Sequence, residues 1–381
     1  ISIIFLSYLL SVFTLNVPMD YGGDEKIYIR FLLNFIYDKP IFETSFQFGY
    51  RWGMYIVPSF FYNLFSSNPI TFFLSSSLTT LISLLIFLIT FKKELKYIGI
   101  ILFLIFWSTN PQIIKITYNL LTQGQGIFAL SISLFFLFKI LDTKIDKFRN
   151  YLLLSISLFY LWGIKEVNIF IILPILIILL LKKNWKQNIQ LHCILFVLIL
   201  IESFSIYLFS GNLYFGRLDY FLFNENNVTN TQIWWDASYF KNNYDGIFSR
   251  WTKIYTISKL IFPVVFIIAF YNIFFKPKIS IRIYVLSIIL LFYSICITLF
   301  FKKLNPFVPF VPIKMDNIVI MFPILFVILI NFILDLNLKK ISYRILISIL
   351  FFYFLLHHIN YLYKVFLDDI KNTNHNILNV Y

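Results

Sequence analysis

Hydrophobic runs of about 18 or more residues recur along this chain, and they constrain its fold more than any other feature. A run of that length, wound as an α-helix, crosses the roughly 30 Å of hydrocarbon in a bilayer. The composition agrees, because 60% of the 381 residues are hydrophobic and only 13% are charged. Soluble domains carry about 25% charged residues. The sequence therefore predicts an all-α, polytopic integral membrane protein.

Eleven spans are expected, forming one membrane domain over residues 1–381 with no separate soluble domain. The first is predicted to be a transmembrane helix rather than a removed signal peptide, because no small-residue cleavage site follows it. The third and fifth are short, which fits helices that are tilted or partly re-entrant. The expected spans lie near 1–17, 70–91, 97–110, 123–141, 150–164, 166–181, 189–210, 258–275, 280–301, 316–335 and 341–357.

Basic residues give these spans a direction. If the N-terminus is cytoplasmic, five short loops face inward and each carries three basic residues, which is the pattern of cytoplasmic loops. These residues are Lys92, Lys93 and Lys96; Lys144, Lys147 and Arg149; Lys182, Lys183 and Lys186; Lys276, Lys278 and Arg282; and Lys339, Lys340 and Arg344. The net charge of +14 is thus assigned to topology and membrane-lipid contact, with no nucleic-acid partner expected.

The outward-facing loops hold most of the carboxylates. They are 18–69, 111–122, 211–257, 302–315 and a polar tail over 358–381. Any chemistry is therefore expected on the outer face, and the expected location is a bacterial inner (plasma) membrane with the active site facing the periplasm or exterior.

The first outer loop begins with a dense group of carboxylates. Three of the 18 carboxylates in the chain are Asp20, Asp24 and Glu25, where the chain leaves the bilayer. Asp24 occupies the N-cap position of an amphipathic helix whose polar residues recur every four positions as far as Asp38. A carboxylate at the membrane surface is costly if it is covered, which favours a functional role. The alternative is that Asp24 merely caps this helix, and the two roles are compatible.

Isolated polar residues mark three further segments on the outer side. Arg51 lies among aromatic residues, where a guanidinium either binds a phosphate bidentately or anchors the chain at headgroup depth. Lys165 and Glu166 separate two hydrophobic runs with almost no loop; they form a tight hairpin with solvated charges, or direct a lysine at a lipid phosphate. Trp234 and Trp235 suit stacking on a sugar or an interfacial aromatic belt.

Glu202 lies inside the seventh predicted span, about two-thirds of the way outward. A carboxylate within a membrane helix is a site candidate by default, although a hydrogen bond with Ser203, Ser205 or a neighbouring helix would also explain it. The four histidines lack the spacing of metal ligands, and the two cysteines predict no disulfide framework. No cofactor is expected, and a requirement for a divalent metal is left open.

The segment Gly23–Tyr28 resembles the acidic motif in the first outer loop of GT-C-fold glycosyltransferases that use lipid-linked sugars. These include the protein O-mannosyltransferase-like family 39 and the aminoarabinose transferases. An amphipathic helix, Arg51 and Pro58 follow in the order of the family. The Lys-Glu pair at 165–166, followed by an apolar run with Pro174, resembles a signature found later in the same proteins.

The resemblance spans roughly residues 1–185, and beyond that point it is one of architecture. Two positions depart from the family pattern. Arg51-Trp52 stands where the aminoarabinose transferases often have Lys-Pro, and 313–317 stands where the family often has an Arg-Tyr pair. The resemblance therefore leaves the donor sugar and the late half of the site unspecified.

The resemblance implies transfer of a sugar from a polyprenyl-phosphate donor to a glycan, lipid or protein acceptor at the outer face, with inversion at the anomeric carbon. In that scheme Asp24 is the catalytic base, and Glu25 is its less favoured substitute. The residues expected to bind substrate are Tyr28, Arg51, Lys165, Glu166, Trp234 and Trp235.

Two other classes of function stay open. A transporter or flippase for lipid-linked glycans would show polar or broken helices near the midplane, whereas these spans are apolar apart from Glu202. A glycan polymerase or ligase would place several arginines in large outer loops, whereas Arg217 and Arg250 stand alone here.

Overall fold

The computed structural model describes residues 24–37, 51–65, 70–110, 113, 116–117, 122–142, 148–181, 185–210, 264–276, 279–304, 319–335 and 345, and every secondary-structure element there is helical. The elements are α2 (Asp24–Ile36), α3 (Gly53–Phe65), α4 (Ile70–Thr109), α6 (Thr122–Asp142), α7 (Phe148–Ile164), the 3₁₀ helix η1 (Glu166–Asn168), α8 (Ile169–Leu180), α9 (Trp185–Ser210), α13 (Ile281–Leu304) and α15 (Phe322–Asp335). A further apolar helix covers Val264–Phe274. For this part of the chain the predicted all-α class is confirmed.

Helix α4 consists of two antiparallel arms. The helical geometry breaks at Lys96, which has φ 54° and ψ −171°. In one continuous helix, Phe87 and Phe103 would lie about 24 Å apart at 1.5 Å per residue. Their ring centroids are 6.2 Å apart, so the chain reverses between them. The predicted separation into spans at 70–91 and 97–110 is therefore confirmed as two helical arms.

Within the described part of the chain, three helical segments are long and apolar enough to cross a membrane: Leu74–Ser108, which contains both arms of α4, Thr122–Asp142 and Lys186–Ile206. Four shorter apolar helices accompany them at Ile169–Leu180, Val264–Phe274, Ile281–Cys296 and Phe322–Asp335. These segments fall within or close to predicted spans, as expected of a membrane-embedded protein.

The structure divides the predicted span at 166–181 into the 3₁₀ helix η1 and helix α8. Helix α8 has 12 residues and is about 18 Å long, so it does not cross a bilayer alone. The predicted spans at 1–17 and 341–357 lie outside the described residues, apart from residue 345.

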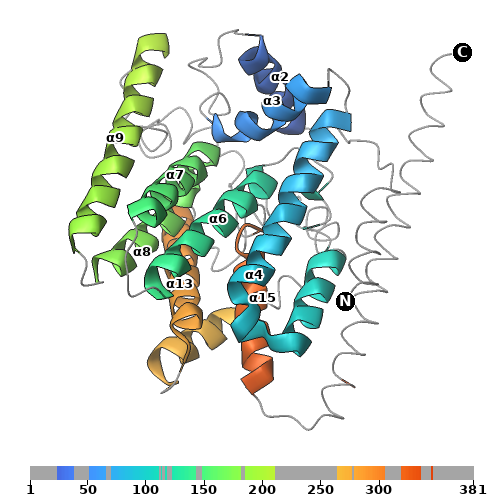
Figure 1. Ribbon diagram of the computed structural model, residues 1–381, viewed down its shortest axis with the longest axis vertical. Coiled ribbons are helices and arrows are strands. Elements are labelled where there is room, and N and C mark those ends of the chain that lie inside the picture. The colour runs from blue at the N-terminus through green and yellow to red at the C-terminus, as the bar shows by residue number, and fades with distance from the viewer. Residues whose placement is uncertain are drawn as a thin grey trace, which may run out of the picture.

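The helices pack as a bundle with α2 and α3 across one end (Figure 1). Helix α6 packs against α4 on one side and α7 on the other, and α9 packs against α7. Helix α15 lies against α4, and α13 contacts α8 and α15. Large aromatic side chains fill the contact between α4 and α15, where Phe106 and Phe326 stack with centroids 5.4 Å apart. The bundle thus gives α2 and α3 a rigid support.

The buried interior is more polar than the sequence pattern predicted. Ser133 of α6 donates a hydrogen bond to Ser157 of α7 at 3.1 Å, and the Tyr160 hydroxyl donates to Oε1 of Gln125 at 3.1 Å. Such bonds hold helices together where no water is available to replace them. The expectation that Glu202 is the only polar exception among the spans is therefore wrong.

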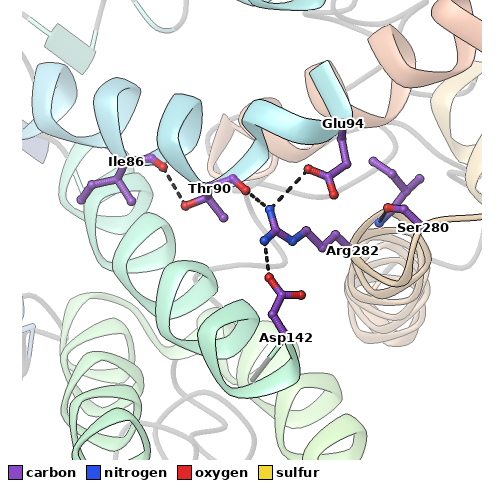
Figure 2. Close-up of polar contacts among 7 residues, drawn as sticks. Ile86, Thr90, Glu94, Asp142, Ser280 and Arg282 are labelled. Atoms are coloured by element: carbon purple, nitrogen blue, oxygen red, sulfur yellow. Dashed lines mark hydrogen bonds and ion pairs between the residues drawn. The ribbon is translucent and has the colours of Figure 1, made fainter. Parts of the chain in front are cut away.

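Arg282 joins α13 to α4 and α6 (Figure 2), at the ends of these helices that lie away from α2 and α3 in Figure 1. Its guanidinium donates hydrogen bonds to the Thr90 carbonyl oxygen and to Asp142, and Nη1 lies 3.4 Å from Oε2 of Glu94. These residues flank three of the five loops predicted to share one side of the membrane. The structure therefore brings together the helix ends beside those three loops, as expected of loops on one side of the membrane.

Candidate functional site

Helix α2 is the predicted amphipathic helix of the first outer loop. It covers Asp24–Ile36, with Phe31 and Leu32 buried and Arg30 exposed, as the polar repeat requires. Asp24 is the first helical residue. The side chains of Asp24 and Glu25 lie outside the description. Position 24 precedes Tyr28 by one helical turn, so the acidic motif is tied in space to whatever Tyr28 contacts.

Tyr28 contacts Arg51, which is 23 positions later in the chain. Nη1 of Arg51 donates to the Tyr28 hydroxyl at 2.5 Å, and the two side chains are only 5% and 2% exposed. A buried guanidinium is stable only where acceptors replace its lost water. Two residues that the sequence assigned to substrate binding are thus directly bonded, and Arg51 ties the segment that precedes α3 to helix α2.

The segment Arg51–Gly53, here called the return segment, packs directly on the end of α7. A Cβ atom built on Gly53 would lie 2.7 Å from the Gly163 carbonyl carbon and 2.9 Å from the Ile164 backbone nitrogen. Contact this close between two backbones requires the absence of a side chain at position 53. The first outer loop is therefore seated on the hairpin between α7 and α8.

Gly163 is required for the same contact from the opposite side. A Cβ there would lie 2.4 Å from Cζ2 of Trp52, because the indole covers the glycine. The Trp52 ring also packs against Phe159, with centroids 4.9 Å apart. Each glycine of the pair thus makes room for a group that belongs to the other segment.

Glu202 also contacts this arrangement, and two hydrogen bonds to its carboxylate explain why it is buried. Its Oε1 accepts a hydrogen bond from Nε1 of Trp52 at 2.8 Å, and its Oε2 accepts one from Nε1 of Trp162 at 2.6 Å. The carboxylate is 7% exposed. We call Trp52, Trp162 and Glu202 the indole clasp. The sequence left open a hydrogen bond with Ser203, Ser205 or a neighbouring helix, and the bond from Trp162 of α7 confirms the neighbouring helix. The second donor, Trp52 of the first outer loop, was not expected.

Lys165 lies in the tight turn between α7 and α8. Asn168 shapes this turn, since its side-chain amide donates to the Leu161 carbonyl at 2.8 Å and its backbone N–H donates to the Lys165 carbonyl at 3.1 Å. Lys165 itself is half-buried. The sequence predicted a tight hairpin at this point, and the structure confirms it.

The structure thus connects three of the sequence-predicted site residues. Tyr28 and Arg51 are bonded to one another, and the return segment that carries Arg51 touches the turn that carries Lys165. Glu202, left open by the sequence, joins them through the clasp. The Glu166 side chain, Trp234 and Trp235 lie outside the described residues, as do the loop at 211–257 and the tail at 358–381.

The site lies at one end of the helical bundle, where Arg51 is buried and Lys165 is half-buried. A lysine at the turn between α7 and α8 can bind an anionic group. Among the described residues there is no group of three or more His, Cys, Asp or Glu placed to hold a metal. Comparison with protein-family models and with curated proteins found no match to this chain.

Proposed function

We propose that the protein is a membrane glycosyltransferase that moves a sugar from a polyprenyl-phosphate donor to an acceptor on the outer face of the membrane. The acceptor hydroxyl belongs to a glycan, a lipid or a protein. One observation carries the proposal: the return segment, bonded to the helix that begins at Asp24, is seated on the turn that holds Lys165. A carboxylate-bearing helix end and a lysine are thereby linked through two contacts.

The reaction requires three chemical tasks. The carboxylate of Asp24 takes the proton of the acceptor hydroxyl as its oxygen bonds to the anomeric carbon. The bond from that carbon to the phosphate oxygen breaks, and its electron pair leaves with the polyprenyl phosphate. A cation stabilises the charge that develops on this leaving group. Attack opposite the leaving group inverts the anomeric carbon.

Lys165 is the residue that we assign to the leaving phosphate. It lies at the turn between two apolar helices, where a polyprenyl tail can remain in lipid while its phosphate reaches the ammonium group. Arg51 has a different part in this scheme. Its guanidinium is buried and bonded to Tyr28, so it holds helix α2 in place beside the return segment.

Replacing Lys165 with methionine is expected to lower kcat/KM for the donor by about 10- to 100-fold, because a charge-assisted hydrogen bond contributes about 1.5–3 kcal/mol. The assay measures release of polyprenyl phosphate from a panel of polyprenyl-phosphate sugars by purified protein in nanodiscs. Lys139→Met is the control, since this exposed lysine lies over Phe135 near the far end of α6.

The same assay tests the competing functions. A protein that binds the donors without releasing polyprenyl phosphate would be a transporter or flippase. Extension of a lipid-linked glycan, with release of the polyprenyl diphosphate carrier, would identify a polymerase or ligase. Either result would contradict the proposed function, and equal activity of both lysine variants would contradict the role of Lys165.

A further inference from the structure

The indole clasp joins three parts of the chain that are far apart in sequence. Trp52 precedes Glu202 by 150 residues, and Trp162 precedes it by 40. The three residues belong to the return segment, to the end of α7 and to α9. Helices α7 and α9 pack against each other, so Glu202 and Trp162 belong to the bundle. Trp52 comes from the first outer loop.

The chemistry of the clasp depends on a carboxylate. An indole nitrogen is only a donor, and a carboxylate accepts at both of its oxygens. Here each oxygen has its own indole, at 2.8 and 2.6 Å. A glutamine of the same shape has one oxygen and one NH₂ group, so one of the two indoles would face another donor. The arrangement therefore selects glutamate rather than a neutral isostere.

The clasp also determines where the return segment lies. The Trp52 ring fits over Gly163, and Gly53 touches the Gly163 backbone, so the hydrogen bond to Glu202 holds a tryptophan that is already fitted to the turn. Arg51 directly precedes Trp52 and bonds Tyr28. A shift of Trp52 would consequently carry helix α2 away from the Lys165 turn.

We propose that Glu202 is a positioning residue that latches the first outer loop onto the Lys165 turn, and that this latched state is the one that binds the donor phosphate. The second half of this proposal rests on the proposed function, whereas the latch itself does not. Glu202 acts through the two indoles and contacts neither the donor nor the acceptor. Its loss is therefore expected to weaken donor binding more than it slows the chemical step.

The latch is tested by the accessibility of a buried position in α3. Met54 is fully buried beside the return segment, and Met54→Cys in a background with Cys193→Ala and Cys296→Ala provides a single thiol. With Glu202→Gln added, a membrane-impermeant maleimide is expected to label this thiol at least 10-fold faster. Ser203→Ala is the matched control, because Ser203 is an equally buried neighbour that bonds the Ile199 carbonyl of its own helix.

A double-mutant cycle distinguishes a lost latch from general destabilisation. Trp52→Phe removes one donor and keeps a ring over Gly163. In the double variant with Glu202→Gln, the amide oxygen can still accept from the Trp162 indole, and no Trp52 N–H is left to face the amide NH₂ group. The double variant is therefore expected to be labelled no faster than Glu202→Gln alone. Multiplicative acceleration would show that the two residues act independently, and it would overturn the latch.

Donor kinetics test the functional half. Glu202→Gln is expected to raise KM for the donor at least 10-fold, with kcat within about threefold of the wild type. If labelling became faster but KM did not change, the latch would be supported and its role in donor binding would be rejected. A raised KM without faster labelling would place Glu202 in direct contact with donor and reject the latch. If the wild-type protein turns over no donor, the proposed function fails, and the labelling rates still decide the latch.

Discussion

Replacing Asp24 with asparagine is expected to reduce sugar transfer by roughly 10²–10⁴-fold, the range typical of a lost general base. Asparagine has the same shape, but it cannot accept the acceptor proton. The expected signature is therefore a fall in kcat with donor binding nearly unchanged. Release of polyprenyl phosphate and thermal unfolding of the purified variant, measured together, separate lost chemistry from lost structure.

Glu25→Gln and Asp38→Asn are the controls for this prediction. Glu25 is adjacent to Asp24, and Asp38 is the last polar residue of the repeat that the sequence predicted for this helix. Both variants are expected to keep a transfer rate within about fivefold of the wild type, because neither removes the proposed base, Asp24. A large loss in Glu25→Gln with an active Asp24→Asn would transfer the role of base to Glu25. Full activity of both Asp24→Asn and Glu25→Gln would show that the acidic motif has no part in the mechanism.

Alanine at Gly163 or Gly53 is expected to lower stability by about 2–4 kcal/mol, which combines overpacking with the loss of a charge-assisted hydrogen bond. At Gly163 the new methyl group would lie 2.4 Å from the Trp52 ring, and rotation of that ring would break its bond to Glu202. At Gly53 the methyl group would meet the backbone of Gly163, which has no rotamer to adjust.

Thermal unfolding in detergent, followed by intrinsic fluorescence, measures this effect. Gly99→Ala is the matched control, because its Cβ would lie 3.0 Å from a methyl carbon of Ile330 and 3.1 Å from one of Leu334, and both side chains can move. Alanine also favours a helix over glycine. We expect this control to change stability by less than about 1 kcal/mol. Equal effects at Gly99 and Gly163 would contradict a special fit at the return segment.

Features coded by local pattern were predictable from the sequence. The hydrophobic runs located most of the helices, and Lys92–Lys96 placed the turn between the two arms of α4. Polar residues at every fourth position predicted the amphipathic helix α2. These features depend on residues within a few helical turns of one another, so one stretch of sequence contains all the information they need.

The indole clasp was not predictable, because it joins residues 40 and 150 positions apart. Glu202 was conspicuous as a carboxylate in an apolar run, but a tryptophan near a membrane surface is equally expected in an interfacial belt. Nothing in the sequence around Trp52 indicates that its nitrogen has a distant acceptor. Gly163 was also visible in the sequence. It is required there because the Trp52 ring, from another segment, lies where a side chain would be.

The partner of Arg51 was not predictable either, because it comes from packing between distant segments. An isolated arginine among aromatic residues is typical of phosphate binding or of headgroup anchoring. The structure gives it a buried tyrosine partner, which the spacing of 23 residues could not reveal. The division of the predicted span at 166–181 has a local cause. Residues Glu166–Asn168 form a 3₁₀ helix, so helix α8 begins only at Ile169.

The most direct test of the central claim is photo-crosslinking with a polyprenyl-phosphate sugar that carries a diazirine on the isoprene unit next to the phosphate. Mass spectrometry of the purified, crosslinked protein then locates the phosphate end of the donor. The account predicts labelled peptides from the return segment at 51–53 and from the turn at 162–168, competed by unlabelled donor. Labelling confined to the opposite end of the bundle, around Lys92, Lys93 and Arg282, would contradict it.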